Sequence, residues 1–152
     1  MEAIRDHARR AYPHECCGVL IGDPGARSKR VSRLHPMPNV HEEGHERRYR
    51  IGPAEWAAIE RGARAEGERL LGVYHSHPDH PARPSEYDRE WAWPWYSYII
   101  VAVERGEARD ATCWTLRVDR SAFDAEAVVI EEADDRRAAE AAGQPREATH
   151  GR

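Results

Sequence analysis

An eight-residue run that ends in two histidines places the strongest constraint on how this chain can fold. The run, residues 70–77, reads LLGVYHSH, and its length and apolar content predict a strand inside a sheet. Alternate side chains of a strand point to the same face, so His75 and His77 share the face of Val73. A fold that buries this strand must therefore hold two imidazole rings side by side at its end.

The rest of the sequence reads as short strands mixed with helices. We expect helices at 2–12, 53–67 and 85–95, strands at 16–22, 28–34, 98–103 and 111–118, shorter strands at 47–51 and 123–130, and a long loop at 35–46. This mixture, with late strands that look antiparallel, predicts one α/β domain of the mixed α+β type over residues 1–130.

Length and charge limit the classes of function that this chain can have. The chain has 152 residues, enough for one domain, and its 27 acidic and 23 basic residues form no basic stripe, which argues against a nucleic-acid partner. No apolar run approaches the ~18 residues of a membrane span, and the first residues lack the apolar core of a signal peptide. We therefore expect a cytoplasmic protein without a membrane partner, and the sequence leaves a monomer and a homodimer open.

The cysteines and the end of the chain carry no functional signal. Cys16, Cys17 and Cys113 are odd in number and have no C-x-x-C spacing, so we expect three buried, reduced side chains and no disulfide framework. Residues 131–152 are rich in Ala, Glu, Asp and Arg without an apolar stripe, which predicts a disordered tail.

A serine and an aspartate follow the two histidines at a spacing that suggests a metal site. Two imidazoles at i and i+2 suit one metal ion, although such a pair is often surface decoration. Pro84 and Ser85 read as a helix start, which puts Asp88 one turn along on the side of the cap. His75, His77 and Asp88 would then converge and leave a fourth position for water, as in catalytic zinc sites. A plain helix cap with an acidic first turn is the alternative, and the two are compatible.

The pattern H-S-H, seven residues, Ser, two residues, Asp resembles the signature of the JAMM (MPN+) zinc metalloprotease family. In that family a glutamate precedes a Cys-Gly-hydrophobic strand, and residues 14–22 (HECCGVLIG) look like this element. The resemblance covers residues 2–130. It implies an MPN/JAMM-type, cytidine-deaminase-like fold with a central curved, mostly antiparallel sheet flanked by two or three helices.

The resemblance also implies roles for five side chains. His75, His77 and Asp88 would bind one Zn²⁺. Glu15 would take a proton from the attacking water and pass it to the leaving amine, and Ser85 would help to hold the oxyanion. Zinc can lower the pKa of water from about 16 to about 7, and a hydroxyl aimed at an oxyanion contributes ~3 kcal/mol. Without the family pattern, Glu15 would read as an ordinary exposed loop glutamate.

The implied substrate is a protein conjugate. The segment after Asp88 lacks the insertion of the polyubiquitin-cleaving eukaryotic members, so the chain resembles the compact bacterial and archaeal branch, which is associated with ubiquitin-like sulfur carriers ending in Gly-Gly. We expect a zinc-dependent isopeptidase or peptidase that cleaves after that Gly-Gly, including release of cysteine from a carrier–cysteine adduct. A zinc hydrolase or deaminase of small molecules and a non-catalytic MPN scaffold are the alternatives, but deaminases use a C-x-x-C pair and scaffolds lose the ligands.

Two further groups of residues are weaker candidates. His80 reads as a substrate-facing or exposed side chain, and His41 with His45 offers at most an accidental second metal site. The aromatic run Trp91, Trp93, Trp95, Tyr96 and Tyr98 has mixed spacing. Such runs more often pack in a core than form a binding platform, so we expect core packing there.

Overall fold

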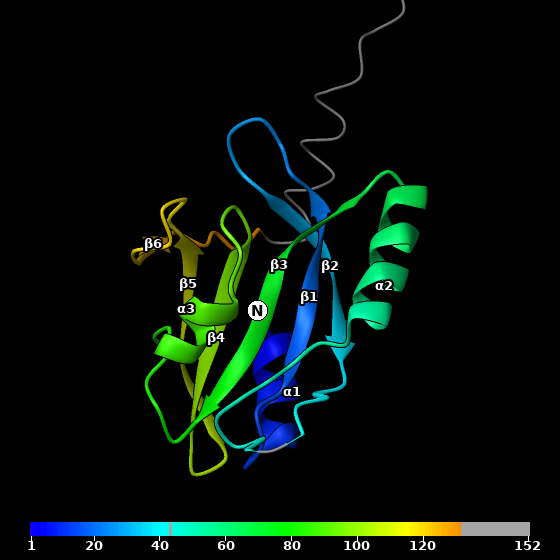
Figure 1. Cartoon of the computed structure of the whole chain (residues 1–152). Helices are drawn as coiled ribbons and strands as arrows, with labels where there is room; N and C mark the ends of the chain where they lie inside the picture. Colours follow the sequence, from blue (N-terminus) through cyan, green and yellow to red (C-terminus); the bar gives the residue numbers. More distant parts are fainter. Residues whose placement is uncertain (43, 132–152) are drawn as a thin grey trace, which may run out of the picture.

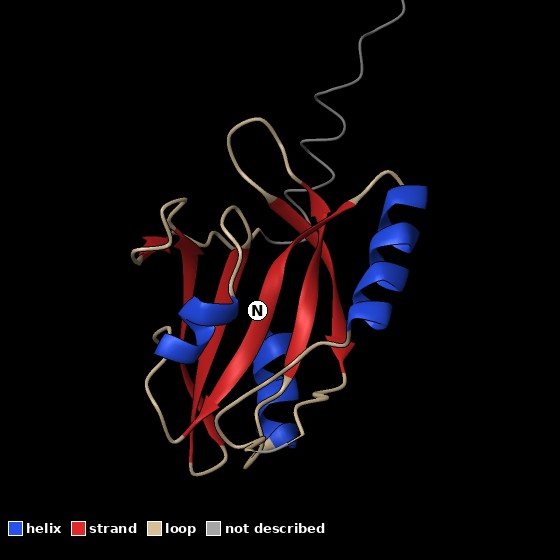
Figure 2. Ribbon diagram, viewed as in Figure 1, coloured by secondary structure: helices blue, strands red, loops and turns tan. Residues whose placement is uncertain are grey.

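The fold was obtained as a computed structural model, and it describes residues 1–42 and 44–131. The elements follow one another as α1 (Glu2–Ala11), β1 (Cys17–Asp23), β2 (Arg30–Met37), α2 (Pro53–Ala65), β3 (Arg69–Pro78), α3 (Glu86–Trp91), β4 (Ser97–Glu104), β5 (Glu107–Leu116) and β6 (Phe123–Glu126). The strands form one six-stranded sheet in the order β2-β1-β3-β4-β5-β6 (Figures 1 and 2).

One strand pair differs from the rest in direction. β3 and β4 run parallel, whereas every other neighbouring pair in the sheet is antiparallel. A parallel pair needs a crossover connection, and here the crossover contains α3. The predicted mixed α/β fold, with a mostly antiparallel sheet and two or three helices, is confirmed.

Helices cover both faces of the sheet, and this explains the continuous apolar runs of the central strands. On one face Ile4 and Ala8 of α1 pack in a cluster with Leu71 and Tyr74 of β3. On the other face, Trp56 of α2 packs against Val19 and Ile21 of β1 and Leu70 of β3. Val73 of β3 also packs with Trp56, and the alternation of the strand beyond it places the side chains of His75 and His77 on the same α2 side.

The parallel pair begins where the backbones of β3 and β4 approach closely. Gly72 of β3 pairs with Ser97, the first residue of β4. A Cβ atom at Gly72 would lie 2.0 Å from the carbonyl oxygen of Ser97, so no larger residue fits without moving a strand. This contact fixes where the parallel pair begins.

Two sequence expectations about the loops are wrong. Residues 47–51 form no strand but belong to a loop that crosses the α2 side of the sheet, and β2 continues through Met37 instead of ending at residue 34. Pro36 is tolerated in β2 because this strand is at the sheet edge, where a missing N–H can face away from the ladder.

Two predicted elements are shorter than expected. The helix expected at 85–95 ends at Trp91, because Pro94 disfavours helical geometry at the residue before it and has no N–H to donate. The last strand ends at Glu126, and Val128, Val129 and Ile130 beyond it are exposed.

The remaining sequence expectations concern cysteines, membrane segments and the tail. Cys16, Cys17 and Cys113 are free and buried, as predicted. Among the residues that the structure describes, no helix has the length and apolar character needed to cross a membrane. The tail expected at 131–152 lies, apart from Glu131, outside the described residues.

Candidate metal centre

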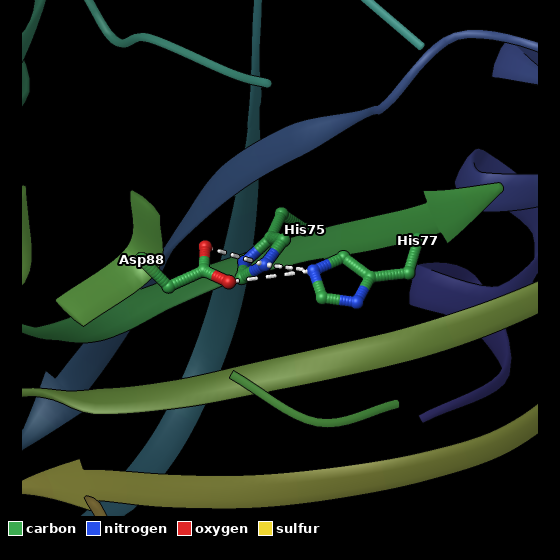
Figure 3. Close-up of side chains that lie close together, drawn as sticks. All are labelled: His75, His77 and Asp88. Atoms are coloured by element: carbon green, nitrogen blue, oxygen red, sulfur yellow. Dashed lines mark hydrogen bonds and ion pairs between the residues drawn. The ribbon is translucent and has the colours of Figure 1, made fainter. Parts of the chain in front are cut away.

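Two histidines of β3 and one aspartate of α3 meet above the α2 side of the sheet (Figure 3). Nε2 of His75 lies 3.1 Å from Oδ1 of Asp88, and Nε2 of His77 lies 3.5 Å from Oδ2. One ligand atom from each residue falls within 4.8 Å of the others. All three side chains are buried, with exposed fractions of 0% for His75 and 7% for the other two. The structure thus brings together the three predicted ligands.

A capping box holds Asp88 in place. The N–H of Asp88 donates to Oγ of Ser85 at 3.1 Å, while the N–H and the hydroxyl of Ser85 each donate to Oδ2 of Asp88 at 2.6 Å. The predicted helix start at Ser85 is confirmed. The cap and the site are therefore one arrangement, because the hydrogen bonds that start α3 also aim the carboxylate at the histidines.

Charges within the cluster stabilise its carboxylate. Burial opposes ionisation of Asp88, but the two histidines and the hydrogen bond from Ser85 outweigh burial and hold the pKa of Asp88 well below its usual range. Burial lowers the pKa of His75. Burial acts in the same direction on His77, but its interactions with Asp88 and Glu15 prevail and raise the pKa.

The donor set fits zinc. Two imidazole nitrogens and one carboxylate oxygen form a three-residue set of the kind that catalytic zinc sites use. Nδ1 of His77 donates to the carbonyl oxygen of Pro81 at 2.8 Å, which leaves the lone pair of Nε2 directed at the cluster. Nδ1 of His75 is buried without a hydrogen-bond partner among the described residues.

An aromatic ring packs against the imidazole of His75, whose Nδ1 has no hydrogen-bond partner among the described residues. The ring of Tyr49 stacks on the ring of His75, with centroids 4.5 Å apart and planes inclined by 25°. Sequence reasoning missed Tyr49, which lies in the loop that crosses the sheet, where no periodicity marks it. An aromatic residue in a loop rich in polar residues was the only available signal.

Glu15 lies buried beside the cluster, two residues before the start of β1. Its N–H donates to the carbonyl oxygen of His45 at 2.6 Å, and its own carbonyl accepts from Nδ2 of Asn39 at 3.2 Å, so the loop fixes its backbone. Burial raises the pKa of Glu15 to about 8; the charge of His77 opposes the rise and that of Asp88 adds to it. Its side chain is therefore within electrostatic reach of both, and the exposed-loop alternative is wrong: Glu15 is 6% exposed.

The weaker histidine candidates stay outside this centre. His80 is exposed, in agreement with one of its two sequence interpretations. His45 bonds through Nε2 to the carbonyl oxygen of His41, and His41 packs against the ring of Tyr87. Within the described part of the chain, no second group of three or more metal-ligating side chains exists.

The aromatic run divides into two parts. Tyr98 is buried, and Tyr96 packs partly buried against the core, as predicted. The core packing expected for the three tryptophans is wrong: Trp91, Trp93 and Trp95 are 62%, 69% and 49% exposed. For Trp93 and Trp95 the reason is the early end of α3, because the residues after Trp91 leave the helix and no longer follow its buried face.

Comparisons with known proteins agree with this geometry. A family model described as prokaryotic homologs of the JAB domain matches residues 1–117. A desampylase of Haloferax volcanii is 40% identical over 106 residues, which cover 66% of this chain and 74% of that protein. A CysO-cysteine peptidase of Mycobacterium tuberculosis is 36% identical over 103 residues, covering 67% and 68%. The solution structure of a Desulfitobacterium hafniense protein superposes with a TM-score of 0.75 at 31% identity, covering 87% and 88% of the two chains.

Proposed function

The chain belongs to the family of prokaryotic homologs of the JAB domain, and from this we infer that it is a zinc-dependent JAMM-type hydrolase acting on protein conjugates. We propose that it cleaves the amide bond after the C-terminal Gly-Gly of a ubiquitin-like or sulfur-carrier protein, including a carrier–cysteine adduct. Its similarity to proteins named desampylase and CysO-cysteine peptidase supports this substrate class. The proposed domain is residues 1–130, and its buried free cysteines favour a reducing, cytoplasmic location.

The observation that carries the proposal is the convergence of His75, His77 and Asp88 on one point beside Glu15. We assign the first three as ligands of one zinc ion. When bound, zinc supplies a Lewis acid that polarises a carbonyl oxygen and makes a nucleophile available at neutral pH. A non-catalytic scaffold has no need for three converging ligands with a buried carboxyl beside them.

The chain's own residues would move the proton and hold charge. The carboxylate of Glu15 would accept a proton from the attacking water and return it to the nitrogen of the leaving amine as the amide C–N bond breaks. The hydroxyl of Ser85, which now donates to Asp88, would donate to the negative oxygen that develops on the scissile carbonyl.

Burial of the centre supports a slender substrate. The side chains of His77, Asp88 and Glu15 are only 6–7% exposed, so little room is left for a branched chain beside them. Glycine has no Cβ and lets a backbone approach closely, which suits a tail that ends in Gly-Gly.

The test is cleavage by the zinc-loaded protein of carrier–cysteine and carrier–lysine conjugates, compared with small amides of cysteine and lysine. Release is followed by mass spectrometry. We expect cleavage of the carrier conjugates and little or none of the small amides. Faster turnover of the small amides would replace the proposal by a small-molecule hydrolase.

A further inference from the structure

Three exposed tryptophans lie on the segment that joins the candidate metal centre to β4. We call the side chains of Trp91, Trp93 and Trp95 the tryptophan surface; they are 62%, 69% and 49% exposed. Three exposed tryptophans within five residues of sequence are uncommon on a monomer and typical of binding surfaces, where tryptophan carries much of the binding energy.

The tryptophan surface is continuous with the metal centre through one short helix. Asp88 lies in the first turn of α3, and Trp91 is the last residue of this helix. Tyr87, next to Asp88, contacts Trp91 with ring centroids 6.2 Å apart. Since a helix rises 1.5 Å per residue, only about 4.5 Å along its axis separates the proposed ligand from the first tryptophan.

Positive charge borders the tryptophan surface at both ends. At one end, Arg48 lies over the ring of Tyr87, and a depression of about 630 Å³ is lined by three arginines and two glutamates (Arg48, Arg89, Arg120, Glu86 and Glu90), so cations outnumber carboxylates by one. Arg120 donates to three backbone carbonyls at the end of α3, which carry no net charge to neutralise it. At the other end, Trp95 lines a smaller depression with Arg69 and with Arg64, which is paired with Glu60. The complementary partner has an apolar patch bordered by carboxylates.

We propose that the tryptophan surface docks the folded body of the ubiquitin-like carrier whose tail enters the metal centre. This proposal rests on the proposed function and adds the surface to which the folded carrier binds. An extended tail spans up to about 3.5 Å per residue, so roughly five residues reach about 17 Å. A carrier tethered by such a tail has to lie over the surface next to the centre, and α3 with the tryptophans offers an apolar part of that surface with an excess of arginines at its border.

The experiment compares substrates with and without a folded carrier. The Trp91→Ala/Trp93→Ala variant is assayed on a carrier–cysteine conjugate and on a five-residue peptide amide with the same Gly-Gly tail. We expect KM for the conjugate to rise at least 10-fold while hydrolysis of the peptide stays within twofold. The matched Trp91→Phe/Trp93→Phe variant keeps the rings and should retain most of the wild-type KM. An Arg48→Glu variant should also raise KM for the conjugate, most strongly at low salt.

Other outcomes would overturn the proposal. Equal loss on the peptide and the conjugate would mean that the tryptophans support the centre itself. An unchanged KM for the conjugate, with wild type dimeric and the alanine variant monomeric in sedimentation, would make the tryptophan surface a contact between copies of the chain. An unchanged KM with loss of binding to anionic lipid vesicles would make it a membrane contact.

Direct binding of the unconjugated carrier, measured by calorimetry on the wild type and the variants, separates docking from chemistry. Binding that weakens in the alanine variant supports docking even if no conjugate is cleaved, in which case the proposed function alone fails. Cleavage of the conjugate by both proteins with identical carrier affinity leaves the proposed function standing and rejects the docking surface.

Discussion

The ring of Tyr49 lies nearly flat on the ring of His75, although the two residues come from a loop and a central strand. The loop is anchored by Asn39, whose side chain donates to the carbonyl of Arg48 at 2.9 Å and accepts from the N–H of Arg50 at 3.1 Å. Because Nδ1 of His75 has no hydrogen-bond partner in the described structure, this stacking helps to orient the imidazole together with the contact of its Nε2 with Asp88.

Replacing Tyr49 should therefore weaken zinc binding without removing a ligand. For Tyr49→Ala we expect a zinc dissociation constant raised by roughly 10-fold or more, in the range typical of residues that orient ligands. Tyr49→Phe keeps the ring and should bind zinc as the wild type does. Competition with a chromogenic chelator measures both variants, and an alanine variant with wild-type affinity would contradict this role.

The ligand assignment predicts about one zinc ion per chain. His75→Ala and His77→Ala should each remove most of the bound metal, because a three-residue site loses a third of its protein ligands. His80→Ala is the matched control, since this exposed histidine lies three residues after His77 outside the cluster. Elemental analysis after dialysis is the measurement. Full occupancy in a His75→Ala/His77→Ala double variant would refute the assignment.

The proton-transfer role of Glu15 can be separated from metal binding. Glu15→Gln preserves the shape of the side chain but cannot accept a proton, so kcat should fall by ~100-fold or more while zinc stays bound. Kinetics on a carrier conjugate and elemental analysis of the same sample decide the matter. Loss of the metal together with activity would make Glu15 a ligand instead.

Access to the buried centre predicts selectivity for the tail of the substrate. Changing the last glycine of the carrier to valine should remove most of the cleavage rate. The branched side chain would have to enter a site whose lining residues are almost fully buried. Exchanging cysteine for lysine as the leaving amine should cost less. Mass spectrometry on the matched conjugates measures both, and equal rates for glycine- and valine-ended carriers would count against a narrow approach.

His7 should make stability depend on pH at a distance from the centre. Its Nδ1 is hydrogen-bonded to the hydroxyl of Tyr74 at 2.9 Å, and burial, with a smaller effect of Arg10, lowers its pKa. The unfolded chain then binds more protons than the folded chain just below pH 6.5, so the free energy of unfolding falls as pH drops through that range. Urea unfolding at pH 7 and pH 5 should show a smaller drop for His7→Gln than for the wild type. An identical drop would mean that His7 does not contribute.

The sequence predicted those parts of the site that are local. His75, His77, Ser85 and Asp88 lie within one strand–loop–helix segment, so alternation along a strand and the preference of serine for helix starts were enough to bring them together. Glu15 depends on pairing of β1 with β3, which no local pattern shows, and only the family resemblance identified it.

The features that the sequence could not predict depend on the paths of irregular segments. Tyr49 reaches His75 because the loop crosses the sheet, and a loop without periodicity does not reveal its path. The exposure of Trp93 and Trp95 follows from the end of α3 at Trp91, and helix ends are the part of an element that local propensity defines least well.

The crossover between β3 and β4 makes two classes of inactive variant distinguishable. All three proposed ligands are carried by β3 and its crossover, whereas Glu15 lies on the segment just before β1, a strand that is held by the β1–β3 ladder. Lesions that loosen β1 should yield protein that still carries its metal but no longer turns over, and lesions in the crossover should yield protein that carries none. Metal content alone would then distinguish inactive variants that disturb β1 from those that disturb the crossover.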